Sequence, residues 1–190
     1  WSLYDYDKAK RTGGGILAAG VGGPITGRGA HIFLIDDPVK NRDEAESATI
    51  RETAKSWYSS TAYTRLAPGA GIVVIQTRWH DDDLAGHLLS EMREAEKEMI
   101  ASEDGEWPED ADRWRTVDFP AMAVTDEKYR KMGEALHPER YDIKALRKIK
   151  RTLAPRDWAA LYQQNPQVED GAYFQKKYFK FFKKKPEYLD

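Results

Sequence analysis

Residues 31–38 read His-Ile-Phe-Leu-Ile-Asp-Asp-Pro, a short apolar run that ends in two adjacent carboxylates. Residues 32–35 favour a β-strand, and because they are uniformly apolar we expect it in the middle of a parallel sheet with both faces covered. In open α/β sheets the ends of the strands border the ligand crevice, so Asp36 and Asp37 are predicted at the mouth of a site. An unpaired carboxylate is costly to bury, which favours a nearby cation or water.

The pair Asp36 and Asp37 has the form of a Walker B motif. In that motif the first carboxylate helps to hold Mg²⁺ and the second orients or activates the attacking water. An apolar strand followed by two acids also occurs at solvated turns. On these residues alone, both interpretations stay open.

The glycine-rich passage before this strand, residues 13–29, is not a phosphate-binding loop of the Walker A type. No Gly-Lys-Ser/Thr occurs in the 190 residues, so the usual lysine and hydroxyl contacts to the phosphates and Mg²⁺ are missing. Because glycine permits positive φ, the passage predicts instead a short strand at residues 16–19 and a turn through residues 22–24.

A helix and a second apolar strand follow the acidic pair. Asn41 and Glu44 have the spacing of a capping box, and apolar residues recur at helical spacing from Ile50 to Leu66. Residues 72–75 then form a second buried strand, which also ends in a polar cluster, and the acids 81–83 predict the cap of the next helix. The order strand, helix, strand, helix predicts an α/β fold with a parallel sheet.

The second half of the chain has weaker patterns. Residues 101–113 predict an exposed loop, residues 114–119 one more strand, and residues 142–153 and 155–163 two helices of a small helical subdomain. From Asn165 the pattern loosens into a connector.

Composition sets few limits on function. With 41% hydrophobic and 33% charged residues the chain is typical of a globular protein, and it has no cysteine, which excludes disulfides and thiolate metal sites. The formal charge of −2 conceals residues 176–185, which contain six lysines, no acid and interleaved aromatic residues. Such a segment is typical of a nucleic-acid surface, and the alternative is an edge strand or linker docked on another domain.

Taken in order, these fragments resemble the large terminase subunit of tailed bacteriophages. The resemblance extends over residues 13–174. It is carried by Ile25-Thr26-Gly27-Arg28-Gly29-Ala30, Ile35-Asp36-Asp37-Pro38, Trp57-Tyr58, Arg65-Leu66, Thr77-Arg78-Trp79-His80, Asp82-Asp83-Leu84, Pro138-Glu139-Arg140-Tyr141 and Leu161-Tyr162-Gln163-Gln164-Asn165-Pro166.

The resemblance implies an ATP-driven motor of the additional-strand P-loop class that packages double-stranded viral DNA. Its implied partners are the portal protein, the small terminase subunit and further copies in a homo-oligomeric ring, in the cytoplasm of a bacterial host and without a membrane. Residues 1–120 would be the C-terminal part of the ATPase domain and residues 121–172 a linker subdomain. Residues 173–190 would connect to a nuclease domain that is absent.

The resemblance also implies ATP and Mg²⁺ as cofactors and a role for each site residue. Asp36 would be the magnesium carboxylate, and Asp37 the catalytic carboxylate, although the family commonly has the longer Glu there. Gln76, Thr77 and Arg78 would form the coupling motif that senses the γ-phosphate. Arg28 is similar in placement to an arginine that some members insert into a neighbouring subunit's site, where it would stabilise charge on the transferred phosphoryl group. The alternative is a turn arginine in contact with solvent.

Two other functions remain as alternatives. One is a helicase-like, nucleic-acid-dependent ATPase, which would separate strands as a packaging motor would not. The other is a non-catalytic remnant that binds DNA or phage proteins. Because no Walker A motif is present, we expect the chain alone to hydrolyse ATP poorly or not at all.

Overall fold

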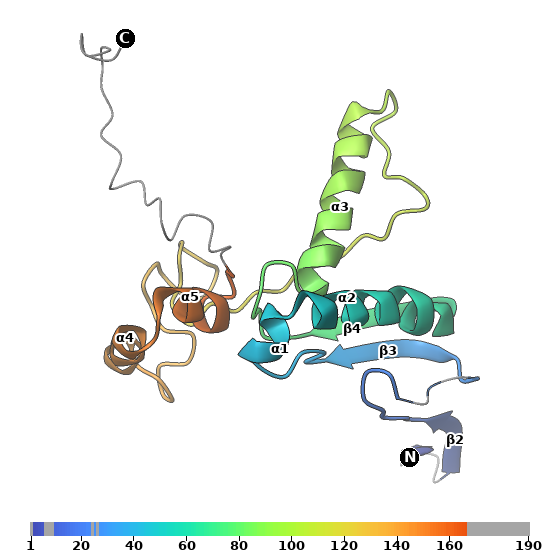
Figure 1. Cartoon of the computed structure of the whole chain (residues 1–190), viewed down its shortest axis with the longest axis horizontal. Coiled ribbons are helices and arrows are strands. Elements are labelled where there is room, and N and C mark those ends of the chain that lie inside the picture. Colours follow the sequence, from blue (N-terminus) through green and yellow to red (C-terminus); the bar gives the residue numbers. More distant parts are fainter. Residues whose placement is uncertain (1, 6–9, 24, 26, 167–190) are drawn as a thin grey trace. The chain divides into compact units, whose positions relative to one another are not determined.

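The computed structural model describes residues 2–5, 10–23, 25 and 27–166, within two compact units (Figure 1). Unit 1 is Trp1–Thr116 and unit 2 is Val117–Asp190. Each unit has its own hydrophobic core. The basic segment 176–185 and the predicted connector to a nuclease domain lie outside the described residues.

The centre of unit 1 is a parallel pair of strands, as predicted. β3 (Ala30–Asp36) lies beside β4 (Leu66–Ile75), and Asp36 is opposite Ile75 at their carboxyl ends. The register shifts between Ala30 and Ile32, where β4 contains Gly69 with a φ of 76°. Glycine adopts this left-handed conformation without a steric cost, so the irregularity is accommodated near the start of the strand pair and the carboxyl ends stay in register.

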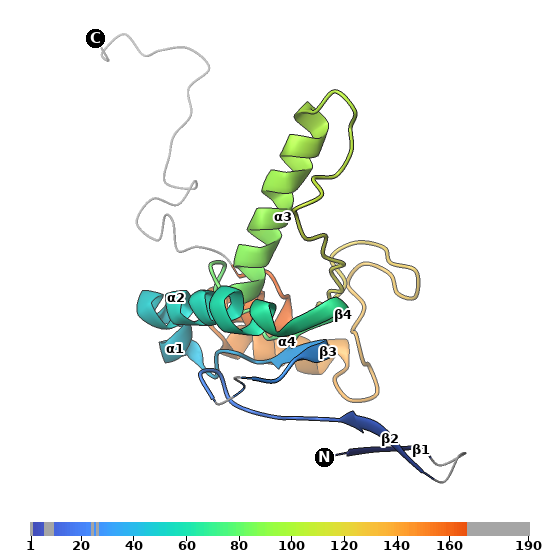
Figure 2. The same cartoon turned by 90° about the vertical axis from the view of Figure 1, so that its right-hand side faces the viewer.

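One face of this sheet carries the core of unit 1. α1 (Arg42–Glu46) and α2 (Ala48–Trp57) follow β3, and α2 runs alongside the strands in both views (Figures 1 and 2). Phe33 packs edge-on against Trp57, with ring centroids 6.1 Å apart. The buried residues of this core are Ile35, Tyr58, Ala62, Leu84 and Leu88.

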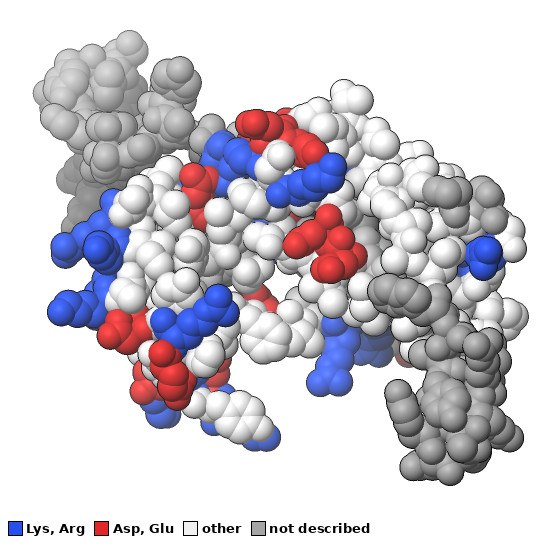
Figure 3. Space-filling model, turned by 90° about the horizontal axis from the view of Figure 1, so that it is seen from below, with Lys and Arg blue, Asp and Glu red and all other residues white. Residues whose placement is uncertain are grey.

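The opposite face of the sheet corrects the expectation that both faces are covered. Ile32 is 74% exposed and Leu34 56%, and Val73 and Ile75 on β4 are exposed as well. No described segment packs on these side chains, because the described sheet has only two strands and its helices lie on one side. Figure 3 shows a broad uncharged area over the region of β3.

The helical stretch after β3 is interrupted where a single helix was predicted. Asn41 caps α1 by accepting a hydrogen bond from the Glu44 N–H at 3.0 Å, as predicted, while Glu44 accepts from the Lys40 N–H at 3.1 Å. Ser47 then ends α1 and caps α2. The chain continues through a π-helical turn, Tyr58–Ala62, and a 3-10 turn, Tyr63–Arg65, directly into β4.

Two of the predicted strands are wrong. Residues 16–19 are irregular, and the nearby strand is β2 (Lys10–Gly15), which pairs antiparallel with β1 (Ser2–Asp5). A turn was predicted at residues 22–24; the structure has one at residues 20–23, where the Gly23 N–H donates to the Gly20 carbonyl at 2.8 Å, and residue 24 lies outside the described residues. Residues 114–119 also form no strand.

α3 (Leu84–Ala101) is the longest helix of unit 1. Asp83 caps it, and Leu84 and Leu88 bury its first turns in the core. The predicted loop after α3 runs back along the helix (Figures 1 and 2) and brings Trp114 to the edge of the core, where the backbone N–H of Trp114 donates to the Met92 sulfur at 3.3 Å.

Unit 2 contains helices within the two stretches predicted to be helical, residues 142–153 and 155–163. α4 (Ile143–Thr152) is capped by Asp142, and α5 (Pro155–Asp157) continues into a π-helical turn, Trp158–Tyr162. Trp158 stacks on Tyr162 with ring centroids 5.0 Å apart. The buried residues of this core are Ala135, Leu146 and Trp158.

Candidate functional site

The two adjacent carboxylates lie where β3 ends. Asp36 is the last residue of the strand and continues the exposed row formed by Ile32 and Leu34, because side chains alternate between the two faces. Asp37 leaves the strand with a φ of 40°, a left-handed conformation that is uncommon outside glycine but that aspartate tolerates. Both residues are exposed.

The carboxylate of Asp37 contacts the polar cluster that follows β4. The Thr77 N–H donates to Asp37 Oδ1 at 2.9 Å, and the Asp37 N–H donates to the Ile75 carbonyl at 2.9 Å. The two sequence motifs are therefore brought together, because parallel strands end at the same edge of a sheet. Oδ2 of Asp37 has no hydrogen-bond donor among the described residues.

Arg78 is held inside its own loop by a buried aspartate. Its Nε donates to both carboxylate oxygens of Asp83, at 3.0 and 2.8 Å, and its Nη2 donates to the Asp81 carbonyl at 3.4 Å. Asp83 also accepts from the Gly86 N–H at 2.8 Å as the cap of α3. Burial raises the pKa of Asp83, and the charge of Arg78 offsets only part of this effect.

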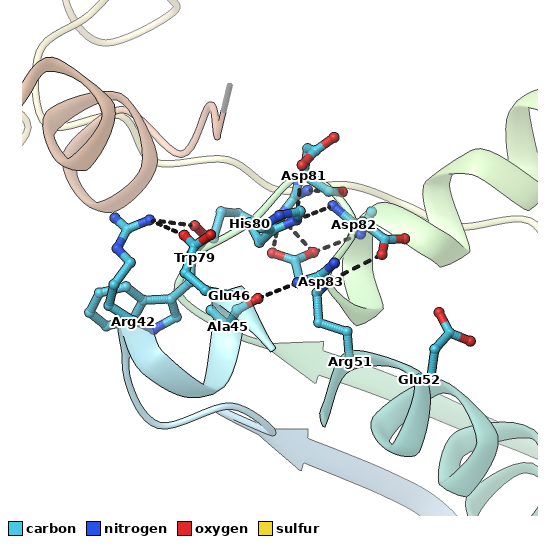
Figure 4. A network of polar contacts seen from close by, with 12 residues as sticks. Arg42, Ala45, Glu46, Arg51, Glu52, Trp79, His80, Asp81, Asp82 and Asp83 are labelled. Carbon is cyan, nitrogen blue, oxygen red and sulfur yellow. Dashed lines mark hydrogen bonds and ion pairs between the residues drawn. The ribbon is translucent and has the colours of Figure 1, made fainter. Parts of the chain in front are cut away.

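A second aspartate ties the same loop to α2 (Figure 4). Asp82 accepts from Arg51 Nε at 3.0 Å and from Lys55 Nζ at 2.5 Å, and Lys55 also pairs with Glu52 at 2.7 Å. Arg51 Nη1 donates to the Ala45 carbonyl at 2.6 Å. Burial alone would raise the pKa of Asp82, but the hydrogen bonds and charges of Lys55 and Arg51 together hold it below its ordinary value.

Two further contacts fix the loop. The Arg42 guanidinium lies over the Trp79 ring, 5.5 Å from its centroid, and donates to the Trp79 carbonyl at 3.3 Å (Figure 4). At Gly86 an added Cβ would lie 1.7 Å from the Asp81 carbonyl oxygen, so the first turn of α3 touches the loop backbone directly. Together with the Asp82 and Asp83 contacts, these interactions anchor residues 78–83 to α1, α2 and α3.

Residues 14–181 match a family model described as the N-terminal part of the terminase large subunit, T4-like virus type. The chain belongs to the terminase large subunit family. No curated protein shows significant similarity to it. Among the residues that the structure describes, no helix has both the length and the apolar character needed to span a membrane.

Terminase large subunits act in phage DNA packaging and are generally ATPases, which gives the strand-end carboxylates a chemical context. Mg²⁺ is usually held in nucleotide enzymes by one or two carboxylates together with phosphate oxygens and water. Asp36 and Asp37, exposed and adjacent, fit that donor set. No larger cluster of metal-binding side chains occurs among the described residues.

Of the two remaining predicted site residues, Gln76 lies with the loop after β4, where its side chain hydrogen-bonds Asp83, whereas Arg28 makes no such contact. Gln76 follows β4 directly, and its Oε1 is buried without a hydrogen-bond donor among the described residues. Arg28 is exposed beside Gly27, which has a φ of 75°. Arg28 makes no hydrogen bond or ion pair with the part of the chain that is described. The roles assigned to all six site residues therefore stay predictions.

Sequence reasoning missed the residues that anchor the loop. Arg51 and Lys55 lie 31 and 27 positions before Asp82, and no local pattern links such distant charges. One signal was available: Lys55 lies beside the apolar positions Ala54 and Tyr58 of the predicted helix, and a lysine buried at such a position needs an anionic partner. Gly86 gave another, because a glycine inside a helical pattern often marks a close backbone approach.

Proposed function

We propose that this terminase chain supplies the carboxylate edge of a DNA-packaging ATPase site. Asp36 would hold Mg²⁺, Asp37 would orient the attacking water, and residues 76–78 would report the state of the γ-phosphate. One observation carries the proposal: the Thr77 N–H donates to Asp37 Oδ1 at 2.9 Å, so the acidic pair and the coupling segment are in direct contact.

The contact suggests how hydrolysis is coupled to movement. The Thr77 amide fixes one oxygen of Asp37, and the other oxygen is left to accept a proton from water. A shift of the loop when phosphate is released would move the Thr77 amide and, with it, the carboxylate. Mg²⁺, when bound, would neutralise charge on the phosphates, and Asp36 is the residue proposed to hold it.

The ion pairs that hold residues 78–83 support a rigid loop beside the contact between Thr77 and Asp37. Arg78 pairs with Asp83 through both carboxylate oxygens, and Asp82 pairs with α2. An arginine so engaged would contact phosphate only after leaving Asp83, and the side chain of Gln76 also hydrogen-bonds Asp83, so we assign γ-phosphate sensing first to Thr77. Arg28, exposed and without a protein partner among the described residues, is proposed to act on a neighbouring subunit.

The wider assignments rest on family membership. We propose an additional-strand P-loop fold for the complete ATPase, ATP and Mg²⁺ as cofactors, and double-stranded DNA as cargo. We also propose the portal protein, the small terminase subunit and further copies in a ring as partners, in the cytoplasm of a bacterial host. The chain contains no Walker A motif, so we expect it to hydrolyse ATP only when that motif is supplied with it.

The test separates the two carboxylates in a large subunit that contains this segment together with a Walker A motif. Asp37→Asn is expected to lower kcat for ATP by about 100-fold or more with little change in nucleotide affinity, as loss of a general base does. Asp36→Asn should instead weaken Mg²⁺-dependent nucleotide binding. Asp43→Asn, an exposed acid of α1, is the matched control and should change neither quantity.

Wild-type hydrolysis by the Asp37→Asn variant would contradict the assigned role. It would favour a non-catalytic part in DNA or protein binding. ATP-dependent strand separation by the unmodified subunit would favour the helicase-like alternative.

A further inference from the structure

α4 of unit 2 presents a row of cations along one side. Its sequence, residues 143–152, contains five basic residues and no acid. Four of them, at spacings of three and four residues, share one helix face. These four are Lys144, Arg147, Lys148 and Arg151, and all are exposed. We call this set the α4 basic row.

The row points outward because the opposite side of α4 is fixed. Ile143, Leu146 and Ile149 pack in the core of unit 2, and Asp142 caps the helix by accepting from the Ala145 N–H at 2.7 Å. The fifth cation, Lys150, lies over the Trp158 ring at 5.6 Å and is not part of the row. The rotation of α4 about its axis is thus set by packing.

None of the four side chains has a carboxylate partner among the described residues. Several cations elsewhere have a carboxylate partner: Lys97 of α3 pairs with Glu94, Lys131 with Asp126, and Arg51 with Asp82. Like charges three and four residues apart repel one another and destabilise a helix. An anionic partner would therefore reduce the repulsion between the cations of this row. Lys and Arg side chains gather along the left edge of Figure 3, where Figure 1 shows α4.

We propose that the α4 basic row binds the phosphate backbone of double-stranded DNA, an inference that rests on the proposed packaging function. The row runs from Lys144 to Arg151, eight residues that extend over about 10 Å of helix axis, and duplex DNA carries one negative charge per about 1.7 Å of its own axis. No apolar residue of α4 is exposed. Protein interfaces usually add apolar or aromatic anchors to charges, whereas phosphate contacts need only cations.

The experiment measures binding of the whole chain to a fluorescent duplex of arbitrary sequence, about 30 base pairs long, from 50 to 200 mM salt. Four simultaneous changes, Lys144→Gln, Arg147→Gln, Lys148→Gln and Arg151→Gln, preserve helix propensity and remove the charge. We expect at least about a tenfold loss of affinity at low salt, and a log–log salt dependence that flattens by about 0.9 for each lost phosphate contact.

Two controls make the result specific. The pair Arg147→Gln and Lys148→Gln is compared with Arg93→Gln and Lys97→Gln on α3, which removes the same charge from a helix rich in acids. Only the α4 pair should weaken binding. Each measurement is repeated with the six lysines of residues 176–185 changed to Gln, so that a contribution from that segment is separated from the α4 basic row.

Unchanged affinity and salt dependence in the fourfold variant would overturn the proposal, and so would the absence of duplex binding by the unmodified chain. Equal competition by polyglutamate at matched charge would also overturn it, in favour of an acidic protein partner. Asp37→Asn should leave duplex affinity unchanged. Failure of the ATPase assignment would therefore appear in hydrolysis, and failure of the α4 assignment in DNA binding.

Discussion

The proposed ATPase role depends most on Asp37, whose conformation is defined by one backbone torsion and one hydrogen bond. Its φ of 40° takes the chain out of β3, and in that conformation its carboxylate accepts from the Thr77 amide. The two acids were found from the sequence because they follow an apolar strand. The hydrogen bond between Asp37 and Thr77 was not predicted from the sequence, since the two residues lie 40 positions apart. The caps at Asn41 and within the acids 81–83 were predicted because a cap depends only on spacing along the chain, and Asp142, which caps α4, was not singled out as a cap.

Gly86 gives a prediction at the same scale. In Gly86→Ala the new Cβ would collide with the Asp81 carbonyl oxygen at 1.7 Å, and that oxygen belongs to backbone that cannot move alone. We expect a loss of about 3 kcal/mol or more in the free energy of unfolding, measured by urea denaturation. Gly71→Ala, where a Cβ meets nothing within 4 Å, is the control and should be near neutral. Equal effects of the two changes would refute the close approach.

Asp82 gives a pH-dependent prediction. Its pKa is held below the ordinary value of 3.8, so the carboxylate stabilises the folded state above that pH, and the contribution disappears as pH falls through the lowered pKa. Asp82→Asn should cost roughly 1 kcal/mol or less at neutral pH, because its ion pairs are partly exposed to water. Urea denaturation should show this difference shrinking below pH 3.8. Asp110→Asn, a change at an exposed loop acid, should show no such trend; a difference in Asp82→Asn that persists at low pH would argue against the ion pairs as its source.

At the scale of elements, β3 and β4 could be predicted because both are apolar runs ended by polar residues. Their exposed face could not, because sequence alone does not count the strands and helices that cover a sheet. The false strand at residues 114–119 shows the same limit: local β-propensity forms no strand without a partner, and Trp114 instead packs at the edge of the unit 1 core. The helix after Asn41 was predicted. Its break at Ser47 was not, because Ser47 caps α2 in the middle of a continuous helical pattern.

The two faces of β3 should respond differently to truncation. Ile35 is 3% exposed in the core of unit 1, so Ile35→Ala should lower the free energy of unfolding by about 2–5 kcal/mol. Ile32, three residues earlier, is 74% exposed, and Ile32→Ala should change it by about 0.5 kcal/mol or less. Chemical denaturation of the chain measures both. A large loss for Ile32→Ala would mean that its face is covered in solution.

At the scale of the whole molecule, the family is known from the sequence, and the distribution of charge is known from the structure. The sequence supported the α/β class and the terminase family through the order of its motifs, and the family model covers residues 14–181. The spacing of the α4 cations is readable in the sequence, but the structure was needed to show that the opposite face of α4 packs in the core of unit 2 and leaves these cations exposed. The carboxylates at the end of β3 in unit 1 are proposed to act on nucleotide, and the α4 basic row in unit 2 is proposed to bind DNA.

The most direct test of the central claim is DNA packaging into procapsids by the assembled motor, read as DNA protected from nuclease in the presence of ATP. A large subunit with Asp37→Asn should protect no DNA above background, while Asp43→Asn should protect as much as the unmodified subunit. Packaging by Asp37→Asn at the unmodified level would contradict the claim that this carboxylate, held by the Thr77 amide, drives hydrolysis.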